Sequence, residues 1–146
     1  MADNGKPLDL PPQNNLIATN FDLLPADESL SVRPQLVQQW DGLGDLWYKK
    51  DDFFKKPKGI VACKIYTGDL EHGKSAETAV FSAVWNRVLQ ETLREFTYMA
   101  DCAKLSFEIS ILRDNIELKW SGFNDSLVNF VGETLQRISA FREKEC

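Results

Sequence analysis

The chain has 146 residues, 43% of them hydrophobic, which fits one domain or half of a larger α/β domain. Its 22 acidic residues outnumber its 17 basic ones, which disfavours a surface that attracts nucleic-acid phosphates throughout. The N-terminus lacks a basic segment followed by an apolar core, and no window approaches about 18 uninterrupted apolar residues, so neither secretion nor a membrane span is indicated.

Three cysteines, Cys63, Cys102 and Cys146, are far apart and form no C-x-x-C pair. This odd, scattered set indicates neither a disulfide framework nor a thiolate zinc site. A reducing compartment fits best, and we expect a cytoplasmic location.

Residues 1–45 contain five of the six prolines together with Asn, Asp and Gly, which favour extended or turning backbone. We interpret this region as an extended interdomain-type linker that lies over a surface, with a short extended piece at residues 16–24. Its apolar side chains need a surface to cover them; they are Leu16, Ile17, Phe21, Leu23 and Leu24. Residues 46–146 are predicted to be a partial α+β domain.

The first regular elements of that domain are short β-branched or aromatic runs at residues 46–49 and 59–67, which predict strands. Apolar residues at helical spacing then predict a helix over residues 75–103. Ser75 is its expected N-cap, and Glu77 and Glu71 would favour the positive end of the helix dipole.

Residues 105–112 and 115–122 alternate apolar and polar side chains, the period of half-buried strands. The break at residues 113–115 predicts a tight hairpin turn. A second amphipathic helix follows over residues 124–141, with Asn124 or Asp125 as its N-cap. The order β-α-β-β-α predicts an α+β fold with helices packed on one face of an antiparallel sheet.

The single histidine, His72, lies in a Gly-flanked loop near Asp69 and Glu71. It could be a metal ligand or a general base, but without a second histidine a solvated loop residue is the favoured interpretation. No G-x-S-x-G elbow and no Gly-rich phosphate loop occurs. Asp51 and Asp52 could pair as carboxylates, but neighbouring lysines favour an exposed turn of mixed charge.

The stretch from Leu46 to Leu70 combines lysines with the aromatic pair Phe53 and Phe54. Such a segment could bind an acidic peptide or single-stranded nucleic acid through charge and stacking. The two aspartates and the acidic chain make a polar connection between strands the favoured interpretation.

Residue identities carry a further resemblance, in four stretches that keep their order from about residue 10 to residue 138. They are "LPPQNNLIATNFDLLP", "LWYKKDDFFKKPKG", "VLQETLREFTYMADCAKLSFEI" and "WSGFNDSL". Together they resemble the insulin-degrading enzyme and nardilysin branch of the pitrilysin (inverzincin) zinc metallopeptidases. The resemblance covers nearly the whole chain.

This resemblance implies a place inside a longer enzyme whose four related α/β domains form two halves that close around a peptide. The chain resembles the interdomain linker plus the first part of the third domain, in the non-catalytic half. The family binds zinc through H-x-x-E-H and a downstream glutamate. One histidine cannot make that site, so zinc would be held by a domain outside this chain.

If the two halves arose by duplication, the helix at residues 75–103 is the counterpart of the zinc-binding helix. Its expected inward positions are apolar and would coordinate nothing; they are Val80, Phe81, Val84, Val88 and Leu89. Glu91 and Glu95 lie on one face and are expected to be solvated. The family's substrate-positioning Arg and Tyr belong to its fourth domain, so we expect no catalytic, cofactor-binding or metal-binding residue here.

The resemblance therefore predicts a fragment that contributes chamber wall and structural support to a zinc metalloendopeptidase of small peptides, and that is inactive by itself. Its expected partners are the remaining domains or a homologous peptidase chain, and peptide substrates, with no nucleic acid and no membrane. The alternative is a free-standing module that binds peptides or other proteins, for example by strand addition at an exposed sheet edge. A weaker alternative is a regulator that docks on an intact homologous protease.

Overall fold

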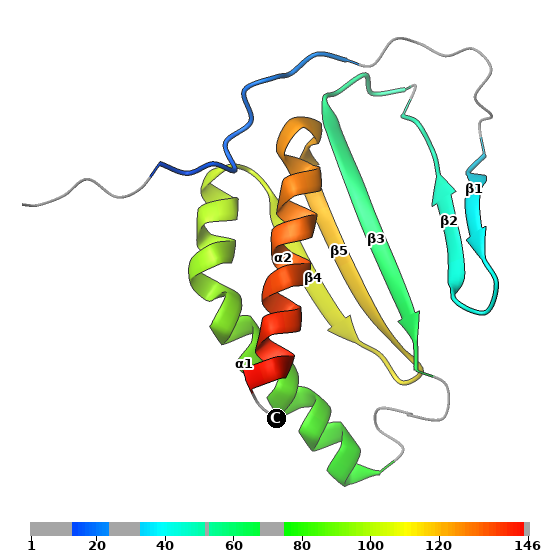
Figure 1. The fold of residues 1–146 in the computed structure, drawn as a ribbon, viewed down its shortest axis with the longest axis vertical. Helices are drawn as coiled ribbons and strands as arrows, with labels where there is room; N and C mark the ends of the chain where they lie inside the picture. The colour runs from blue at the N-terminus through cyan, green and yellow to red at the C-terminus, as the bar shows by residue number, and fades with distance from the viewer. Residues whose placement is uncertain (1–12, 24–32, 52, 68–74, 145–146) are drawn as a thin grey trace, which may run out of the picture.

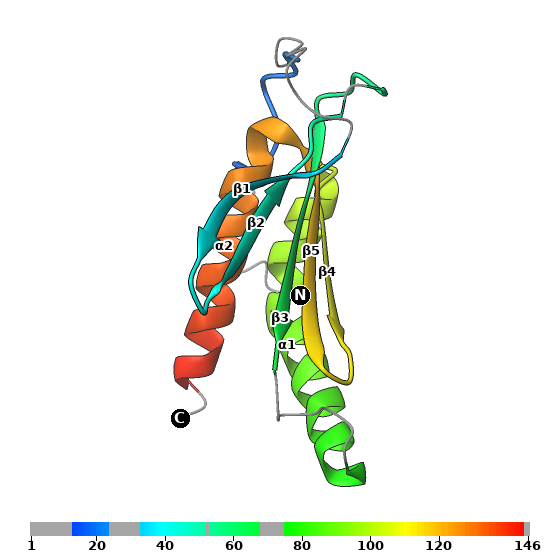
Figure 2. The ribbon, with the colours of Figure 1, turned by 90° about the vertical axis from the view of Figure 1, so that its right-hand side faces the viewer.

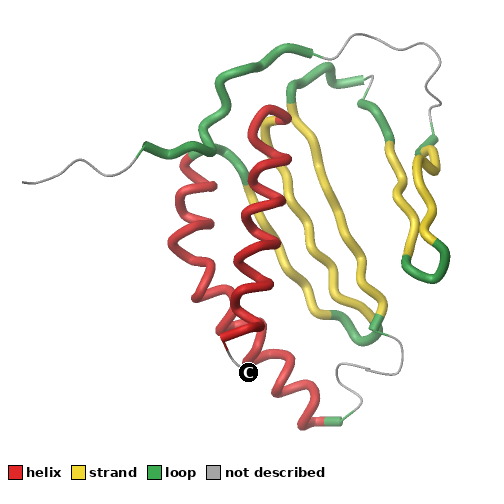
Figure 3. Tube along the Cα trace, viewed as in Figure 1, coloured by secondary structure: helices red, strands yellow, loops and turns green. Residues whose placement is uncertain are grey.

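The structure is a computed structural model that describes residues 13–23, 33–51, 53–67 and 75–144. Five strands and two helices follow one another along the chain (Figures 1 and 3). They are β1 (Gln35–Trp40), β2 (Gly44–Tyr48), β3 (Lys58–Tyr66), α1 (Ala76–Cys102), β4 (Ser106–Ile111), β5 (Asn115–Phe123) and α2 (Asn124–Lys144). Neither helix, within the described residues, is long and apolar enough to span a bilayer.

Three strands form an antiparallel sheet in the order β3-β5-β4, and both helices lie on one face of it (Figure 2). The predicted α+β class is confirmed, and the predicted order β-α-β-β-α corresponds to β3 through α2. The predicted hairpin between β4 and β5 is also present, with its turn at residues 112–114.

The alternation in β5 decides which side of the sheet is buried. Leu118 and Trp120 point toward the helices and are buried, whereas Glu117 and Lys119 point to the opposite face. Phe96 of α1 and Phe130 of α2 meet above this strand, with ring centroids 5.6 Å apart. The main core joins both helices to the sheet; its buried members are Leu16, Phe96, Ala100, Ala103, Leu105, Leu118, Trp120, Leu127 and Phe130.

An antiparallel pair of strands precedes this sheet along the chain, and the sequence predicted only the second of the two. β1 pairs with β2 in a separate two-stranded sheet, so Gln35–Trp40 is a strand inside the region that we interpreted as linker. The expected boundary between residues 45 and 46 falls within β2. The division of the chain into a linker and a partial domain is not tested by this observation and stays a prediction.

Helix α1 begins as expected but buries a different face from the one predicted. Ser75 accepts a hydrogen bond from the Thr78 backbone and the Thr78 side chain accepts one from Ser75, which completes a capping box. Of the five expected inward residues only Leu89 is buried, and the other four are exposed. The reason is that the N-terminal half of α1 extends past the sheet (Figure 1), so only later turns meet β4 and α2.

The buried residues of α1 lie instead between its middle and its C-terminal end. They are Leu89, Leu93, Phe96 and Ala100. Leu89 and Leu93 form a second, smaller core with Phe141 near the end of α2.

The first described stretch of the expected linker, residues 13–23, lies against the ends of both helices. The expected cover of its apolar side chains is found for Leu16 alone among the described ones, because Ile17, Phe21 and Leu23 are exposed; Leu24 lies outside the described residues. Leu16 is buried, and the Asn14 side-chain amide donates to the Met99 carbonyl at 2.7 Å. Asp125 Oδ2 accepts from the backbone N–H groups of Thr19, at 2.8 Å, and Asn20, at 3.0 Å. The Asp125 carboxylate thus holds the linker, a role we had not assigned to this expected N-cap of α2.

Two glycines let the polypeptide layers approach closely at one end of the sheet. Gly122 has φ +151°, and a Cβ there would lie 3.0 Å from the Leu105 Cα atom and from the Lys104 carbonyl oxygen. Gly59 is its cross-strand partner, and a Cβ there would lie 2.9 Å from Asn124 Oδ1. Side chains at these positions would push the start of β4 and of α2 away from the sheet.

We predict that Gly122→Ala lowers the free energy of unfolding by about 3 kcal/mol, because the methyl group meets backbone atoms and the backbone dihedral suits glycine. Gly132→Ala is the matched control, since a Cβ there has open space and α2 gains helix propensity of up to about 1 kcal/mol. Urea unfolding followed by circular dichroism measures both. Equal effects of the two substitutions would contradict the close-approach argument.

We further predict that Asp125→Ala releases residues 13–23, seen as faster amide hydrogen exchange at Thr19 and Asn20. The N–H groups of Asn20 and Thr19 hold the pKa of the Asp125 carboxyl below its ordinary 3.8. Attachment of the linker is therefore complete above that ordinary value and is lost as the pH falls through the lowered pKa. Asp101→Ala, at another exposed carboxylate, should leave both exchange rates unchanged.

Candidate functional site

Several of the residues weighed for catalysis, metal binding or disulfide formation lie outside the described residues. They are Asp52, Asp69, Glu71, His72 and Cys146. Asp51 is described, and its carboxylate accepts from the backbone N–H groups of Phe53 and Phe54, which fixes a turn. Among the described residues no group of three or more His, Cys, Asp or Glu side chains could hold a metal ion.

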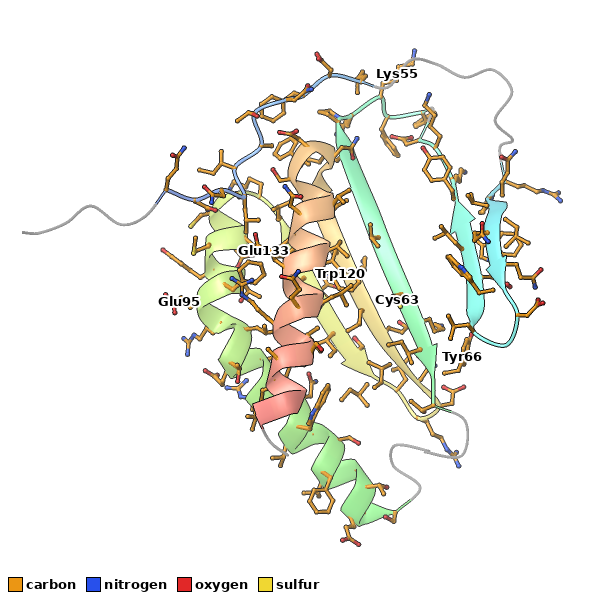
Figure 4. The ribbon with its side chains drawn as sticks, viewed as in Figure 1. Lys55, Cys63, Tyr66, Glu95, Trp120 and Glu133 are labelled. Carbon is orange, nitrogen blue, oxygen red and sulfur yellow. The ribbon has the colours of Figure 1, made fainter. Side chains whose placement is uncertain are left out.

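The carboxylate pair on α1 is solvated, as its spacing indicated. Glu91 makes ion pairs with Arg94 at 3.3 Å and Arg87 at 3.6 Å, and Figure 4 shows Glu95 on the outer side of the helix. Both glutamates line a shallow, open depression with Arg94, Thr97, Tyr98 and Asp101. Exposed pairs of this kind contribute little to stability and present no enclosed acid and base.

The buried face of α1 does not fit a zinc ion. It consists of the apolar side chains of Leu89, Leu93, Phe96 and Ala100, which offer no nitrogen, oxygen or sulfur ligand. The buried face of this helix therefore supports no reaction at a bound metal ion.

The sheet face opposite the helices is mostly polar, although Ile60 and Tyr66 of β3 are exposed on it. Lys64 of β3 contacts Glu117 of β5 at 2.6 Å, and Ser106 and Ser121 share a hydrogen bond of 2.7 Å. The hydrogen bond from Lys64 to Glu117, with their opposite charges, raises the pKa of Lys64. This face is a solvated surface without features of a reactive centre, because opposite charges on neighbouring strands pair with one another.

On the other face, an apolar surface stays uncovered next to the core, and we call it the shelf. Val61, Cys63 and Ile65 of β3 pair across the sheet with Trp120, Leu118 and Ile116, so they point to the helix side. They are nevertheless exposed, because α2 reaches only the start of β3, at Gly59. Val128 and Leu135 on the outer flank of α2 are exposed too and complete the shelf.

A second uncovered surface lies on the N-terminal half of α1. Its exposed apolar side chains are Val80, Phe81, Val84, Trp85 and Val88. The sequence predicted inward positions for Val80, Phe81, Val84 and Val88, since periodicity identifies an apolar stripe and not its cover. It did not single out Trp85. It found no sign of the shelf, because the burial of β3 depends on how far α2 extends over the sheet. Large uncovered apolar surfaces are typical of sites that bind another protein, a ligand or a membrane.

Comparisons with known proteins find a family and several longer relatives. The family profile described as the middle or third domain of peptidase M16 matches residues 2–145. Human insulin-degrading enzyme is 27% identical over 97% of this chain, and mouse nardilysin is 32% identical over 82% of it. The crystal structure of pitrilysin aligns with 89% of the chain at a TM-score of 0.75 and 21% identity, which shows a shared fold.

The chain corresponds to a small part of each of these proteins. It spans 14% of human insulin-degrading enzyme, 10% of mouse nardilysin and 13% of the pitrilysin chain. What the chain resembles is therefore one segment of a much longer polypeptide.

Proposed function

Because the chain belongs to the M16 peptidase family, through its middle or third domain, we propose that it acts as part of a zinc metalloendopeptidase. Its role is to provide wall and support for a chamber in which small peptides are cleaved, with the zinc ion held by another domain. The observation that carries this proposal is the family match over residues 2–145 in a chain that spans 10 to 14% of its relatives.

The two faces of the sheet support this division of roles. The polar face, with its Lys64–Glu117 and Ser106–Ser121 pairs, is suited to line a water-filled space. The shelf and the start of α1 are suited to contact other parts of a peptidase, since apolar surface gains most from burial. We also propose a reducing, cytoplasmic location, supported by the exposed free thiols of Cys63 and Cys102.

The second candidate function is a free-standing module that binds an extended peptide. The outer edge of β3, which pairs with none of the described strands, favours it, because an edge strand offers backbone hydrogen bonds to an incoming strand. An immunoblot of the source cells with antibody against residues 75–120 separates the two functions. We expect a band several-fold heavier than 16.6 kDa, whereas a sole band at 16.6 kDa would favour the free-standing module.

We predict that the isolated chain has no peptidase activity. Incubated with zinc and a fluorogenic peptide of about ten residues, it should give no cleavage that a zinc chelator abolishes, because its described residues hold no metal-ligand cluster. The heavier product, immunopurified from the same cells, is the positive control and should cleave the peptide in a chelator-sensitive manner. Chelator-sensitive cleavage by the isolated chain would refute the assignment to the non-catalytic half.

A further inference from the structure

We propose that the loop between β2 and β3 docks this chain on an anionic membrane surface, with two phenylalanines entering the lipid interface and lysines contacting the headgroups. The loop and the first residue of β3 form a surface that we call the basic–aromatic tip. Its residues are Phe53, Phe54, Lys49, Lys55, Lys56 and Lys58. This contact is peripheral and needs no membrane-spanning helix. It goes beyond the proposed function and departs from our expectation of no membrane partner, which rested on the lack of a long apolar segment.

The two phenylalanines of the tip are uncovered. Phe53 is 86% exposed and Phe54 is 66% exposed, and their rings meet edge to face with centroids 5.0 Å apart. The Asp51 carboxylate fixes their backbone, because it accepts from both N–H groups, at 3.0 and 3.1 Å. Side chains that project this far are poorly covered by a single partner side chain. A lipid interface surrounds a projecting ring and buries most of it.

Further apolar side chains lie at the same end of the sheet. Lys58 begins β3 and pairs with Phe123, the last residue of β5. Phe21 of the linker packs against the Phe123 ring, with centroids 5.1 Å apart, and both Phe21 and Leu23 are half exposed. Figures 1 and 2 show residues 13–23 and the loop between β2 and β3 at one end of the molecule. Two segments therefore present apolar side chains in the same direction along the sheet.

Lysines surround these aromatic side chains. All four lysines of the tip are exposed, and none pairs with a carboxylate among the described residues. The Lys56 ammonium lies 6.0 Å from the centre of the Phe54 ring, and the Lys58 ammonium lies 4.9 Å from that of Phe123. Figure 4 places Lys55 at the same end, where β3 begins. Cationic and apolar groups thus share one surface.

The carboxylates near the tip are arranged differently from the lysines. Those of Asp51 and Asp125 accept from backbone N–H groups, so they face the chain and hold the turn and the linker. Asp22 of the linker is exposed and offsets part of the positive charge. The lysine charges face solvent, where they can meet an anionic surface.

The lysines also distinguish the tip from the shelf. The centres of protein interfaces are depleted of lysine, and the exposed side chains of the shelf carry no charge, which suits cover by other polypeptide. Phenylalanine amid lysine instead suits the boundary between water and lipid, where the ring is buried and the ammonium stays hydrated. Cytoplasmic membrane leaflets contain anionic lipids that attract lysines close to the surface. The location proposed above would bring the tip to such a leaflet.

Single-stranded nucleic acid and acidic peptides could use the same positive charges, but the geometry favours a lipid surface. Bases stack on open ring faces along a basic groove, whereas the rings of Phe53 and Phe54 contact each other and project from a loop. A peptide that adds as a strand uses a sheet edge and not a projecting loop. Both alternatives are outcomes of the test.

The test is co-sedimentation of the isolated chain with sucrose-loaded vesicles of phosphatidylcholine, either alone or with about 30% phosphatidylserine. We expect binding to the anionic vesicles to be at least about tenfold tighter and to weaken as the salt concentration rises, because salt screens the lysine charges. Equal binding to both kinds of vesicle would overturn the proposal, since any uncovered apolar surface could then account for the adhesion. Absence of binding to the anionic vesicles would overturn it as well.

The apolar part of the tip is tested by Phe53→Ser, which should weaken binding to the anionic vesicles about tenfold because the ring no longer enters the interface. Leu43→Ser is the matched control. Leu43 is also 86% exposed but lies in the turn between β1 and β2, so its substitution should leave binding unchanged. An equal loss in both variants would contradict docking through the tip.

The charged part is tested by Lys55→Gln, which should weaken binding about fivefold. Lys119→Gln removes the same charge from the middle of the polar sheet face and should have little effect. If the two variants weaken binding equally, the whole chain and not the tip attracts the vesicles. Circular dichroism spectra equal to that of the unchanged chain establish that all four variants fold.

The competing partners are tested on the same chain by fluorescence polarisation, with a labelled oligothymidine and a labelled polyglutamate peptide. We expect neither to bind in a way that Phe53→Ser weakens. Binding of either one that both Phe53→Ser and Lys55→Gln weaken, with no sedimentation on anionic vesicles, would overturn the proposal in favour of that partner.

The longer protein provides the last test. The heavier product, immunopurified from the source cells, should also sediment with the anionic vesicles and not with phosphatidylcholine alone. Failure to do so would overturn the proposal, because other polypeptide would then cover the tip.

Discussion

The burial of Trp120 at the centre of β5 is the interaction on which the rest of this fold depends. Trp120 is 1% exposed, and its ring lies 5.3 Å from that of Phe107 on β4. Its indole N–H has no hydrogen-bond partner among the described atoms, a cost of about 1–3 kcal/mol. The apolar contacts of the ring with β4 and both helices must outweigh that cost, which makes β5 the strand that aligns the two layers.

Because α1 and α2 pack mainly over β4 and β5, the cover that they provide reaches only the start of β3. The helix-facing side chains of β3 are in register with the buried residues of β5 but remain exposed. The same half-cover explains the N-terminal half of α1, which extends past the sheet (Figure 1). The position of the two helices over β4 and β5 therefore leaves both apolar surfaces uncovered.

The elements predicted well from sequence are those whose burial depends on near neighbours in the chain. β4 and β5 alternate cleanly because each has one polar face, and Ser75 caps α1 through Thr78, three residues away. The inward positions expected near the start of α1 were wrong because that part of the helix extends past the sheet, and the sequence of α1 does not contain the position of β4 and α2 that decides which of its apolar residues are buried. β1 was missed because Gln35, Gln38 and Gln39 make it polar beside Pro34.

The attachment of the linker was equally beyond sequence reasoning, since Thr19 and Asp125 are 106 residues apart and neither is unusual in its local sequence. The family resemblance indicated the fold where periodicity could not, because it rests on the identities of individual residues. The structure shows why some of those identities are required. Gly122, part of the "WSGFNDSL" stretch, is one example: its positive φ and its closeness to Leu105 require glycine.

The uncovered surfaces also bear on how the stability of this segment should be understood. A chain whose described strands leave one sheet edge unpaired and whose described helices expose apolar faces buries less apolar surface than a domain of the same length with covered faces. Contacts with further polypeptide would add to its folding free energy directly, in the way that any ligand of the folded state does. The stability of this segment therefore depends on how much of its uncovered apolar surface other polypeptide buries.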